Sequence, residues 1–279
     1  MNDYFVFVFV FWGSIVVIRC FLLFLFAEMY RYFIYTSYNG TRYCGWQRQP
    51  NGLSIQQCIE EALSTLQRQS VCIVGAGRTD AGVHARQMAA HFNLEKPIDD
   101  LSRLVEKLNC LLSYDIAVER IVRVRGDAHA RFDALSRTYC YVITERKDPF
   151  NYEQVCRMSL KGIDFSLMNE ACKILRDYTD FTSFSKLHTD TKTNNCRIDY
   201  ARWEQENDLW VFTIKADRFL RDMVRAIVST LLEVGRGKRS LTDFWQVIEA
   251  KDRCQAGASV PAKGLMLVGI VYPKELFIE

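Results

Sequence analysis

The chain has 279 residues, which is enough to bury a substantial core in one large domain or in two of ordinary size. A hydrophobic content of 49% with 25% charged residues excludes an intrinsically disordered chain and indicates a globular protein. The net charge of +3 is modest, so any affinity for nucleic acid must come from local clustering of basic residues.

The first 28 residues differ in composition from the rest of the chain. Residues 4–27 are almost unbroken Phe, Val, Ile and Leu, long enough to span a membrane by the rule of about 20 apolar residues. However, the stretch follows Asp3 instead of a basic region, contains Arg19 and has no clear cleavage site. We therefore expect residues 1–28 to be an apolar extension from a start codon placed too early, with Met29 beginning the protein. A membrane anchor is the alternative.

The first half of the remaining chain predicts one supersecondary unit. Aromatic and β-branched residues alternate over 31–38, as in a strand, and Ser54 with Gln57 predicts the N-terminus of a helix with an apolar stripe. The later elements are strands over 71–74, 87–94 and 115–124 and a helix over 100–112. The order β-α-β-β-α-β is that of a ferredoxin-like unit, an antiparallel sheet backed by two helices.

A similar order recurs after about residue 126, with longer loops and an irregular insertion near 149–162. Its predicted elements are strands over 135–144 and 264–272, two strands around Asn207-Asp208, and helices over 163–176, 219–235 and 241–250. No flexible linker separates the halves. We therefore predict an α+β fold in which two ferredoxin-like (RNP-like) halves, 29–125 and 126–279, share a central mixed or antiparallel sheet flanked by helices and loops.

The most informative stretch is Val74-Gly-Ala-Gly-Arg-Thr-Asp-Ala-Gly-Val-His-Ala85. A short apolar run followed by glycines predicts a strand that ends in a loop whose backbone approaches another group closely. Within the loop, Asp80 stands between Arg78 and His84. Local physics alone favours a tight turn in which Asp80 bonds its own backbone, since Asp beside Gly usually does so.

Aromatic and basic residues gather in three other places. The loop over 40–50 interleaves Arg42, Tyr43, Trp46 and Arg48, which suits bases and phosphates, although a loop pinned by one buried Trp is the alternative. Solvated basic faces are common, but two basic stretches beside a glycine-bound carboxylate favour a polyanionic partner. Their members are Arg120, Arg123, Arg125, Arg131 and Arg137, and Arg218, Arg221, Arg225, Arg236, Lys238 and Arg239.

The cysteines and histidines predict neither a metal site nor a disulfide framework. The ten cysteines include no CxxC pair, and the four histidines show no metal-ligand spacing. Isolated cysteines are usually small buried hydrophobes, so we expect reduced thiols in a cytoplasmic protein.

Residues 77–85 resemble the GRTDAGVHA signature of the tRNA pseudouridine synthase A (TruA) family. The resemblance runs from about Arg31 to Tyr272, with two departures. Ser113 and Tyr114 stand where the family commonly has a proline nearby, and Ala128 stands where it usually has Phe before His129. The other matching segments are 40–49 (GTxYxGWQxQ), 109–118 (LNxxLPxDIxV), 129–141 (HARFxAxxRxYxY), 180–184 (DFTSF), 219–225 (FxxxMVR), 251–253 and 261–267.

This resemblance implies the pseudouridine synthase fold and conversion of uridine to pseudouridine at positions 38, 39 and 40 in the anticodon stem-loop of tRNA. It implies an isomerase that needs no cofactor or metal, consistent with the absence of ligand clusters in the sequence. It also implies tRNA as the partner, bound across a homodimer. The first alternative is a non-catalytic RNA-binding protein, which would use the same basic and aromatic residues without Asp80. The second is a membrane-anchored protein of unrelated function.

The resemblance also assigns roles to residues. Asp80 becomes the catalytic carboxylate, and Arg225 the cation beside it, since a buried carboxylate needs a fixed guanidinium to stay charged. Tyr139 stacks on the target base and Leu265 forms an apolar wall, whereas without the resemblance both would be core residues and Arg225 an ordinary surface residue. The residues expected to bind substrate are Arg78, Trp46, His84, Arg131, Tyr139 and Leu265.

Overall fold

The computed structural model describes residues 7–11, 14–18, 29–186 and 192–278. Of the apolar N-terminal stretch it describes only two strands, β1 (Phe7–Phe11) and β2 (Ser14–Ile18), which pair antiparallel with each other. The rest of that stretch lies outside the described residues, so the expected start at Met29 stays a prediction. Among the helices that the structure describes, none combines the length and the apolar character needed to cross a membrane.

The first half of the folded chain is a β-α-β-β-α-β unit. The hydroxyl of Ser54 accepts the backbone N–H of Gln57 at 3.2 Å and so caps the first helix, as its sequence predicts. The strands β6, β3 and β5 pair antiparallel in that order. The elements are β3 (Tyr30–Tyr38), α1 (Ile55–Gln67), β4 (Val74–Gly75), β5 (His84–Leu94), α2 (Leu101–Leu111) and β6 (Ile116–Val124).

The second half repeats this order with additions. Its strands run β11, β7, β10 and β9 across the sheet, all antiparallel to their neighbours, and β8 adds a short parallel pairing to β7. The elements are β7 (Ser136–Thr144), β8 (Cys156–Arg157), α3 (Phe165–Ile174), β9 (Ile198–Glu206), β10 (Leu209–Ala216), α4 (Met223–Gly235), α5 (Leu241–Glu249) and β11 (Leu265–Val271). Short 3₁₀ turns lie at Gly40–Arg42, Leu175–Asp177, Thr182–Phe184, Arg253–Gln255, Ala262–Gly264 and Lys274–Leu276.

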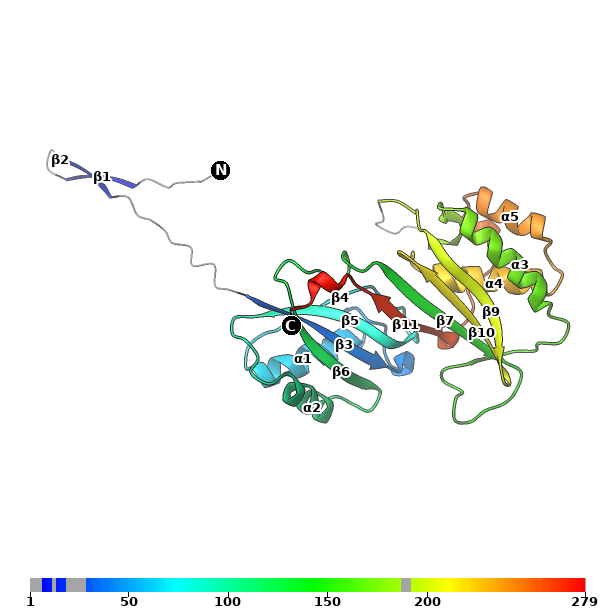
Figure 1. The fold of residues 1–279 in the computed structure, drawn as a ribbon, viewed down its shortest axis with the longest axis horizontal. Coiled ribbons are helices and arrows are strands. Elements are labelled where there is room, and N and C mark those ends of the chain that lie inside the picture. Colours follow the sequence, from blue (N-terminus) through cyan, green and yellow to red (C-terminus); the bar gives the residue numbers. More distant parts are fainter. Residues whose placement is uncertain (1–6, 12–13, 19–28, 187–191, 279) are drawn as a thin grey trace.

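The two halves join into one nine-stranded sheet through β5 and β11. Because β4 has only two residues, it covers β5 only near His91 and leaves the first residues of β5 open. The strand β11 takes that place in parallel register, with Met266 opposite His84. In Figure 1 the helices α1 and α2 accompany the first half, whereas α3, α4 and α5 lie at the opposite end of the sheet. The predicted α+β fold with one shared, mixed sheet is confirmed.

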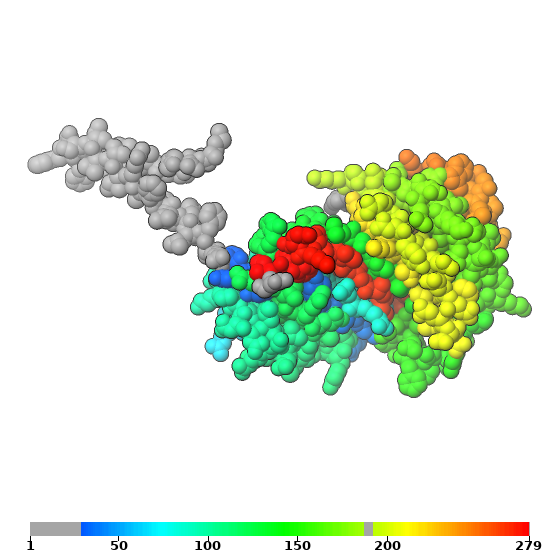
Figure 2. Space-filling model, in the orientation of Figure 1, coloured from blue at the N-terminus to red at the C-terminus, as the bar shows by residue number. Residues whose placement is uncertain are grey.

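The hydrophobic core consists of two clusters, one for each half. The joining strand β11 contributes to both, because Leu267 belongs to the first cluster and Leu265 to the second. Tyr139, on the neighbouring strand β7, also packs against both clusters. In the space-filling view the last residues of the chain (red) reach from the first lobe to the border with the second (Figure 2). The border between the lobes is thus a packed seam.

Several elements begin or end elsewhere than the sequence predicts; for example, β5 begins three residues earlier, at His84. The strand expected over 71–74 is reduced to Val74–Gly75, since the glycines that follow turn the chain into a loop. The helix expected from Phe219 begins only at Met223. Asp222 explains this difference, because its φ of 65° lies in the left-handed region and interrupts a right-handed helix.

Candidate active site

The loop over 76–83 lies where the two halves meet. It connects β4 to β5, and the first residue of β5, His84, stands opposite Met266 of β11. One strand further across the sheet, Leu267 of β11 stands opposite Tyr139 of β7. The sheet register therefore brings the loop with Asp80, the start of β11 and the middle of β7 to one place.

Close backbone packing holds this loop in position. The N–H of Trp46 donates to the carbonyl of Thr79 at 3.0 Å, and Gly45, with a φ of 103°, lies so near that a Cβ would come within 2.5 Å of that oxygen. A Cβ at Gly75 would come within 2.4 Å of the Trp46 indole nitrogen. Trp46 itself is buried. The indole thus packs closely against the residue that leads into the loop, and the substrate contact expected for Trp46 stays a prediction.

Asp80 pairs with an arginine from the other half of the molecule. The Nε of Arg221 lies 3.5 Å from the Oδ1 of Asp80, and the Asp80 side chain keeps 32% of its exposure. The carboxylate is therefore neither sequestered in the core nor surrounded by bulk water. An ion pair of this kind orients a carboxylate while leaving one face open to a ligand.

Arg225, the cation expected beside Asp80, lies elsewhere. Its Nη1 is 3.0 Å from the Oδ1 of Asp222, and its Nε donates to the carbonyl of Val260 at 2.7 Å. Arg253 approaches the same carboxylate, and the hydroxyl of Ser259 donates to it. These groups form a mostly buried network that ties α4 to the loop before β11. Among the described residues the ion pair of Arg225 is with Asp222 and not with Asp80, so the expected role of Arg225 beside Asp80 stays a prediction.

Tyr139 and Leu265 lie at the seam between the two halves. The ring of Tyr139 packs edge-on against Phe219, with centroids 5.1 Å apart. Burial raises the pKa of Tyr139 to about 12, Arg137 opposes this increase and the charge of Asp80 adds to it. Leu265 is only 7% exposed and opens β11 beside β7.

Two of the expected substrate-binding arginines face solvent. Arg78 is exposed, and its side chain makes no hydrogen bond or ion pair with any residue of the described chain. Arg131 is exposed too, and its guanidinium lies 5.8 Å from the ring centroid of Phe132. Both charges are therefore available to a polyanion, as the sequence predicts. Within the described ranges, no three or more His, Cys, Asp and Glu side chains come together as a metal site.

This arrangement can be compared with known proteins. The sequence matches the family described as "tRNA pseudouridine synthase" over residues 34–133 and 171–273, which is more than half of the chain. The chain belongs to this family.

Curated relatives named "tRNA pseudouridine synthase A" resemble the chain over nearly their whole length. The protein from Parabacteroides distasonis is 65% identical over 249 residues, covering 89% of this chain and 98% of its own. The protein from Porphyromonas gingivalis is 58% identical over 255 residues, covering 90% and 100%. The protein from Geobacter sp. (strain M21) is 40% identical over 241 residues, covering 85% and 96%. The resemblance to the tRNA pseudouridine synthase A family is confirmed.

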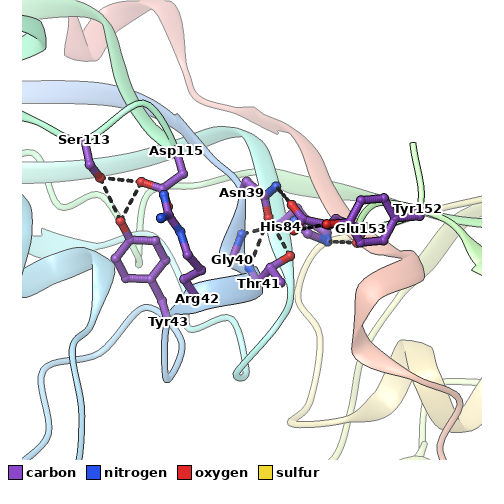
Figure 3. Close-up of polar contacts among 10 residues, drawn as sticks. All are labelled: Asn39, Gly40, Thr41, Arg42, Tyr43, His84, Ser113, Asp115, Tyr152 and Glu153. Atoms are coloured by element: carbon purple, nitrogen blue, oxygen red, sulfur yellow. Dashed lines mark hydrogen bonds and ion pairs between the residues drawn. The ribbon is translucent and has the colours of Figure 1, made fainter. Parts of the chain in front are cut away.

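Within this family framework, His84 is held by backbone groups on both ring nitrogens, and the expected substrate contact stays a prediction. The ring is buried, and its Nδ1 accepts the N–H of Gly40 at 3.1 Å. The Nε2 therefore carries the proton and donates to the carbonyls of Glu153 at 3.0 Å and Lys263 at 3.2 Å. Figure 3 shows His84 enclosed between these segments. Burial lowers the pKa of His84, which favours this neutral form.

The loop over 40–50 is likewise mostly engaged with the protein itself. The Nε of Arg42 donates to the Oδ2 of Asp115 at 2.8 Å, and the hydroxyl of Tyr43 donates to the Oδ1 at 2.7 Å (Figure 3). The Nη1 of Arg48 lies 3.4 Å from the buried carboxylate of Glu60. These side chains therefore fix the loop to the turn before β6 and to α1.

Sequence reasoning did not assign Arg221 to Asp80, although the segment over 219–225 was recognised. The two arginines of that segment, Arg221 and Arg225, are four residues apart and would share one face of a helix. Only the left-handed turn at Asp222 separates them, and an Asp in that conformation is difficult to foresee. The only indication of a role for Arg221 in the sequence was its position in one of the two basic stretches.

Proposed function

We propose that this protein converts uridine to pseudouridine in tRNA, at positions 38, 39 and 40 of the anticodon stem-loop. The observation that carries the proposal is the family signature folded at the seam, with the partly exposed carboxylate of Asp80 paired to Arg221 at 3.5 Å. The names of the relatives from Parabacteroides distasonis and Porphyromonas gingivalis support the same activity.

The reaction is an isomerisation of the nucleoside. The C1′–N1 bond breaks, the uracil turns while it is held, and C1′ joins C5, which loses its hydrogen to water while N1 gains one. A carboxylate can serve as the nucleophile or as the proton acceptor, because both roles use an ionised oxygen. We assign this role to Asp80, and we assign to Arg221 the role of the neighbouring cation that the resemblance gives to Arg225.

The other site residues hold the nucleotide. The target uridine must leave its stack to reach Asp80, which costs a few kcal/mol that contacts to the flanking backbone must offset. Arg78 and Arg131, both exposed, are suited to those contacts. Tyr139 supplies an aromatic face and Leu265 an aliphatic wall, so that the loosened uracil is kept from water.

Mapping pseudouridine in tRNA tests the proposal. Unmodified tRNA with uridine at positions 38, 39 and 40 is incubated with the purified protein, and pseudouridine is located by carbodiimide-dependent stops of reverse transcription. Stops at these positions are the expected result. Binding of tRNA without any stop would favour the alternative of a non-catalytic RNA-binding protein.

We further propose that the enzyme is a cytoplasmic homodimer whose two domains are residues 29–125 and 126–279. The family resemblance supports the dimer, and the two-part core supports the division. Sedimentation equilibrium with and without tRNA tests the assembly, and a mass of one chain at micromolar concentration contradicts it. N-terminal sequencing of the native protein tests whether the chain begins at Met29.

A further inference from the structure

The side chain of Arg137 binds four backbone carbonyl groups at once. Its Nη1 donates to the carbonyls of Ala134 at 3.0 Å and Asp217 at 2.6 Å. Its Nη2 donates to the carbonyls of Ala76 at 3.1 Å and Arg131 at 2.5 Å. The two terminal nitrogens of a guanidinium carry four N–H bonds in one plane, and here each has an acceptor.

These carbonyls belong to three segments that meet only in the folded protein. Ala76 opens the loop that carries Asp80, in the first half of the molecule. Arg131 and Ala134 lie in the connection between the halves, and Asp217 follows directly after β10 in the second half. Arg137 itself is on β7, between β10 and β11. One guanidinium thus fixes the spacing of all three segments across the seam.

Each of the three segments also carries an arginine that no carboxylate neutralises. Arg78 follows Ala76 by two residues, Arg131 supplies one of the carbonyls itself, and Arg218 follows Asp217 directly. In the part of the chain that the structure describes, the side chains of Arg78 and Arg218 form no hydrogen bond or ion pair, and Arg131 has only the ring contact with Phe132. Three like charges on separate loops repel one another, so their spacing depends on a scaffold.

Arg137 provides that scaffold at an energetic cost. Burial lowers the pKa of Arg137, and the four carbonyls replace the water that its terminal N–H groups lose on burial. A lysine could not replace this arrangement fully, because its ammonium has three donors in a tetrahedral arrangement and lacks the planar fork.

We propose that Arg137 is a positioning residue that sets the spacing of Arg78, Arg131 and Arg218, and that these three arginines form a binding site for the RNA phosphates on either side of the target nucleotide. This inference rests on the proposed function. A positioning role does not require Arg137 to contact the RNA, because its four terminal N–H bonds donate to the protein backbone.

The test compares Arg137→Lys, Arg137→Gln and Arg218→Gln with wild type and with Arg202→Gln, an exposed arginine on β9 that serves as the control. The affinity for tRNA is measured at several salt concentrations, together with KM and kcat. Each phosphate contact contributes roughly 0.7 to 0.9 to the slope of log affinity against log salt. We expect Arg218→Gln to reduce the slope by about one contact, and Arg137→Gln to reduce it by about two.

For Arg137→Gln we also expect KM to rise by roughly tenfold or more while kcat falls much less, with Arg137→Lys recovering part of the affinity. A loss of the phosphate site predicts this division between KM and kcat, whereas general unfolding would lower the active fraction and kcat together. Melting curves identify variants that do not fold. If the Arg137 variants do not fold, Arg218→Gln decides the test, because it leaves Arg137 and its four bonds in place.

The inference is overturned if Arg218→Gln and a folded Arg137 variant both show the same salt slope as wild type. This outcome is distinguishable from a failure of the proposed function, in which wild type binds tRNA but forms no pseudouridine. The salt slopes do not depend on turnover and decide the phosphate site in either case.

Discussion

The guanidinium of Arg221 and the carboxylate of Asp80 come from opposite halves of the molecule and lie 3.5 Å apart at the seam. The Arg221 side chain is 58% exposed, so the pair contributes only about 0 to 1 kcal/mol to folding. Its effect is on the orientation of the carboxylate. We therefore expect Arg221→Gln to lower kcat roughly tenfold, equivalent to about 1.4 kcal/mol in the barrier, with little change in the melting temperature.

The control for this variant is Arg236→Gln, which removes an exposed arginine just after α4. It keeps the net charge equal to that of Arg221→Gln, so long-range attraction of tRNA is matched. Single-turnover rates at saturating tRNA compare the two. Equal rates for both variants would show that Arg221 does not act on Asp80.

For Arg225 we expect the opposite pattern, in which substitution lowers the stability of the fold. Its side chain is 20% exposed, and it pairs with Asp222, which is 16% exposed. Arg225→Gln leaves this carboxylate with weaker partners and removes the bond to Val260, so we expect a loss of about 2 kcal/mol in the free energy of unfolding. Urea denaturation measures this value. A loss below about 0.5 kcal/mol would be typical of a surface arginine and would contradict the network.

Alanine substitutions at Gly45 and Gly77 distinguish the effect of close backbone packing from the effect of reduced backbone flexibility. Gly45→Ala forces a Cβ to within 2.5 Å of the Thr79 carbonyl at a φ of 103°, whereas a Cβ at Gly77 meets nothing within 4 Å. We expect Gly45→Ala to lower the free energy of unfolding by about 2 kcal/mol and Gly77→Ala to change it by much less. Urea denaturation of both variants checks this. Similar losses for the two would mean that the loop is not held by the contact at Gly45.

The elements that the sequence predicts well are those with local causes. The cap at Ser54 and the turn at Asn207, whose φ is 55°, mark the start of α1 and the hairpin between β9 and β10. In contrast, the roles of His84 and Trp46 depend on backbone groups from distant segments. A backbone carbonyl that accepts a hydrogen bond cannot be recognised from the sequence, because every residue has a backbone carbonyl.

The same reason explains why Arg137 was seen only as one member of a basic stretch. Its four partners are carbonyls, and two of them come from distant parts of the sequence. Asp217 approaches through the pairing of β7 with β10, and Ala76 through the joining of β5 and β11. The family signature identified the loop with Asp80 in advance. It did not indicate which arginine would reach the carboxylate, since that depends on the left-handed turn at Asp222.

We expect the buried side chain of His91 to make the stability of the protein depend on pH. It is buried, and its ring centroid lies 4.6 Å from that of His129. Burial, followed by the charges of His129 and Arg31, lowers the pKa of His91 to about 4, and Asp133 opposes this shift. In the unfolded chain histidine titrates near 6.5, so between pH 6.5 and about 4 the unfolded state binds more protons and stability falls as the pH falls.

The full effect of this titration on the free energy of unfolding is about 3 kcal/mol. The Nδ1 of His91 accepts the N–H of Ala130 at 3.1 Å, and an asparagine can accept a hydrogen bond without titrating. Denaturation of wild type and His91→Asn is therefore compared from pH 7 to pH 4. We expect the wild-type free energy of unfolding to fall more steeply. Parallel curves would exclude His91 as the cause.

The central claim is that the carboxylate of Asp80 carries out the isomerisation. Asp80→Asn keeps the shape of the side chain and removes its charge, and Asp208→Asn, in the exposed turn between β9 and β10, is the matched control. Tritium release from tRNA labelled at C5 of uracil measures the reaction, because only bond formation at C5 frees that hydrogen. We predict that Asp80→Asn binds tRNA but releases tritium at least about 10³-fold more slowly than wild type and the control. Release within tenfold of wild type would contradict the account.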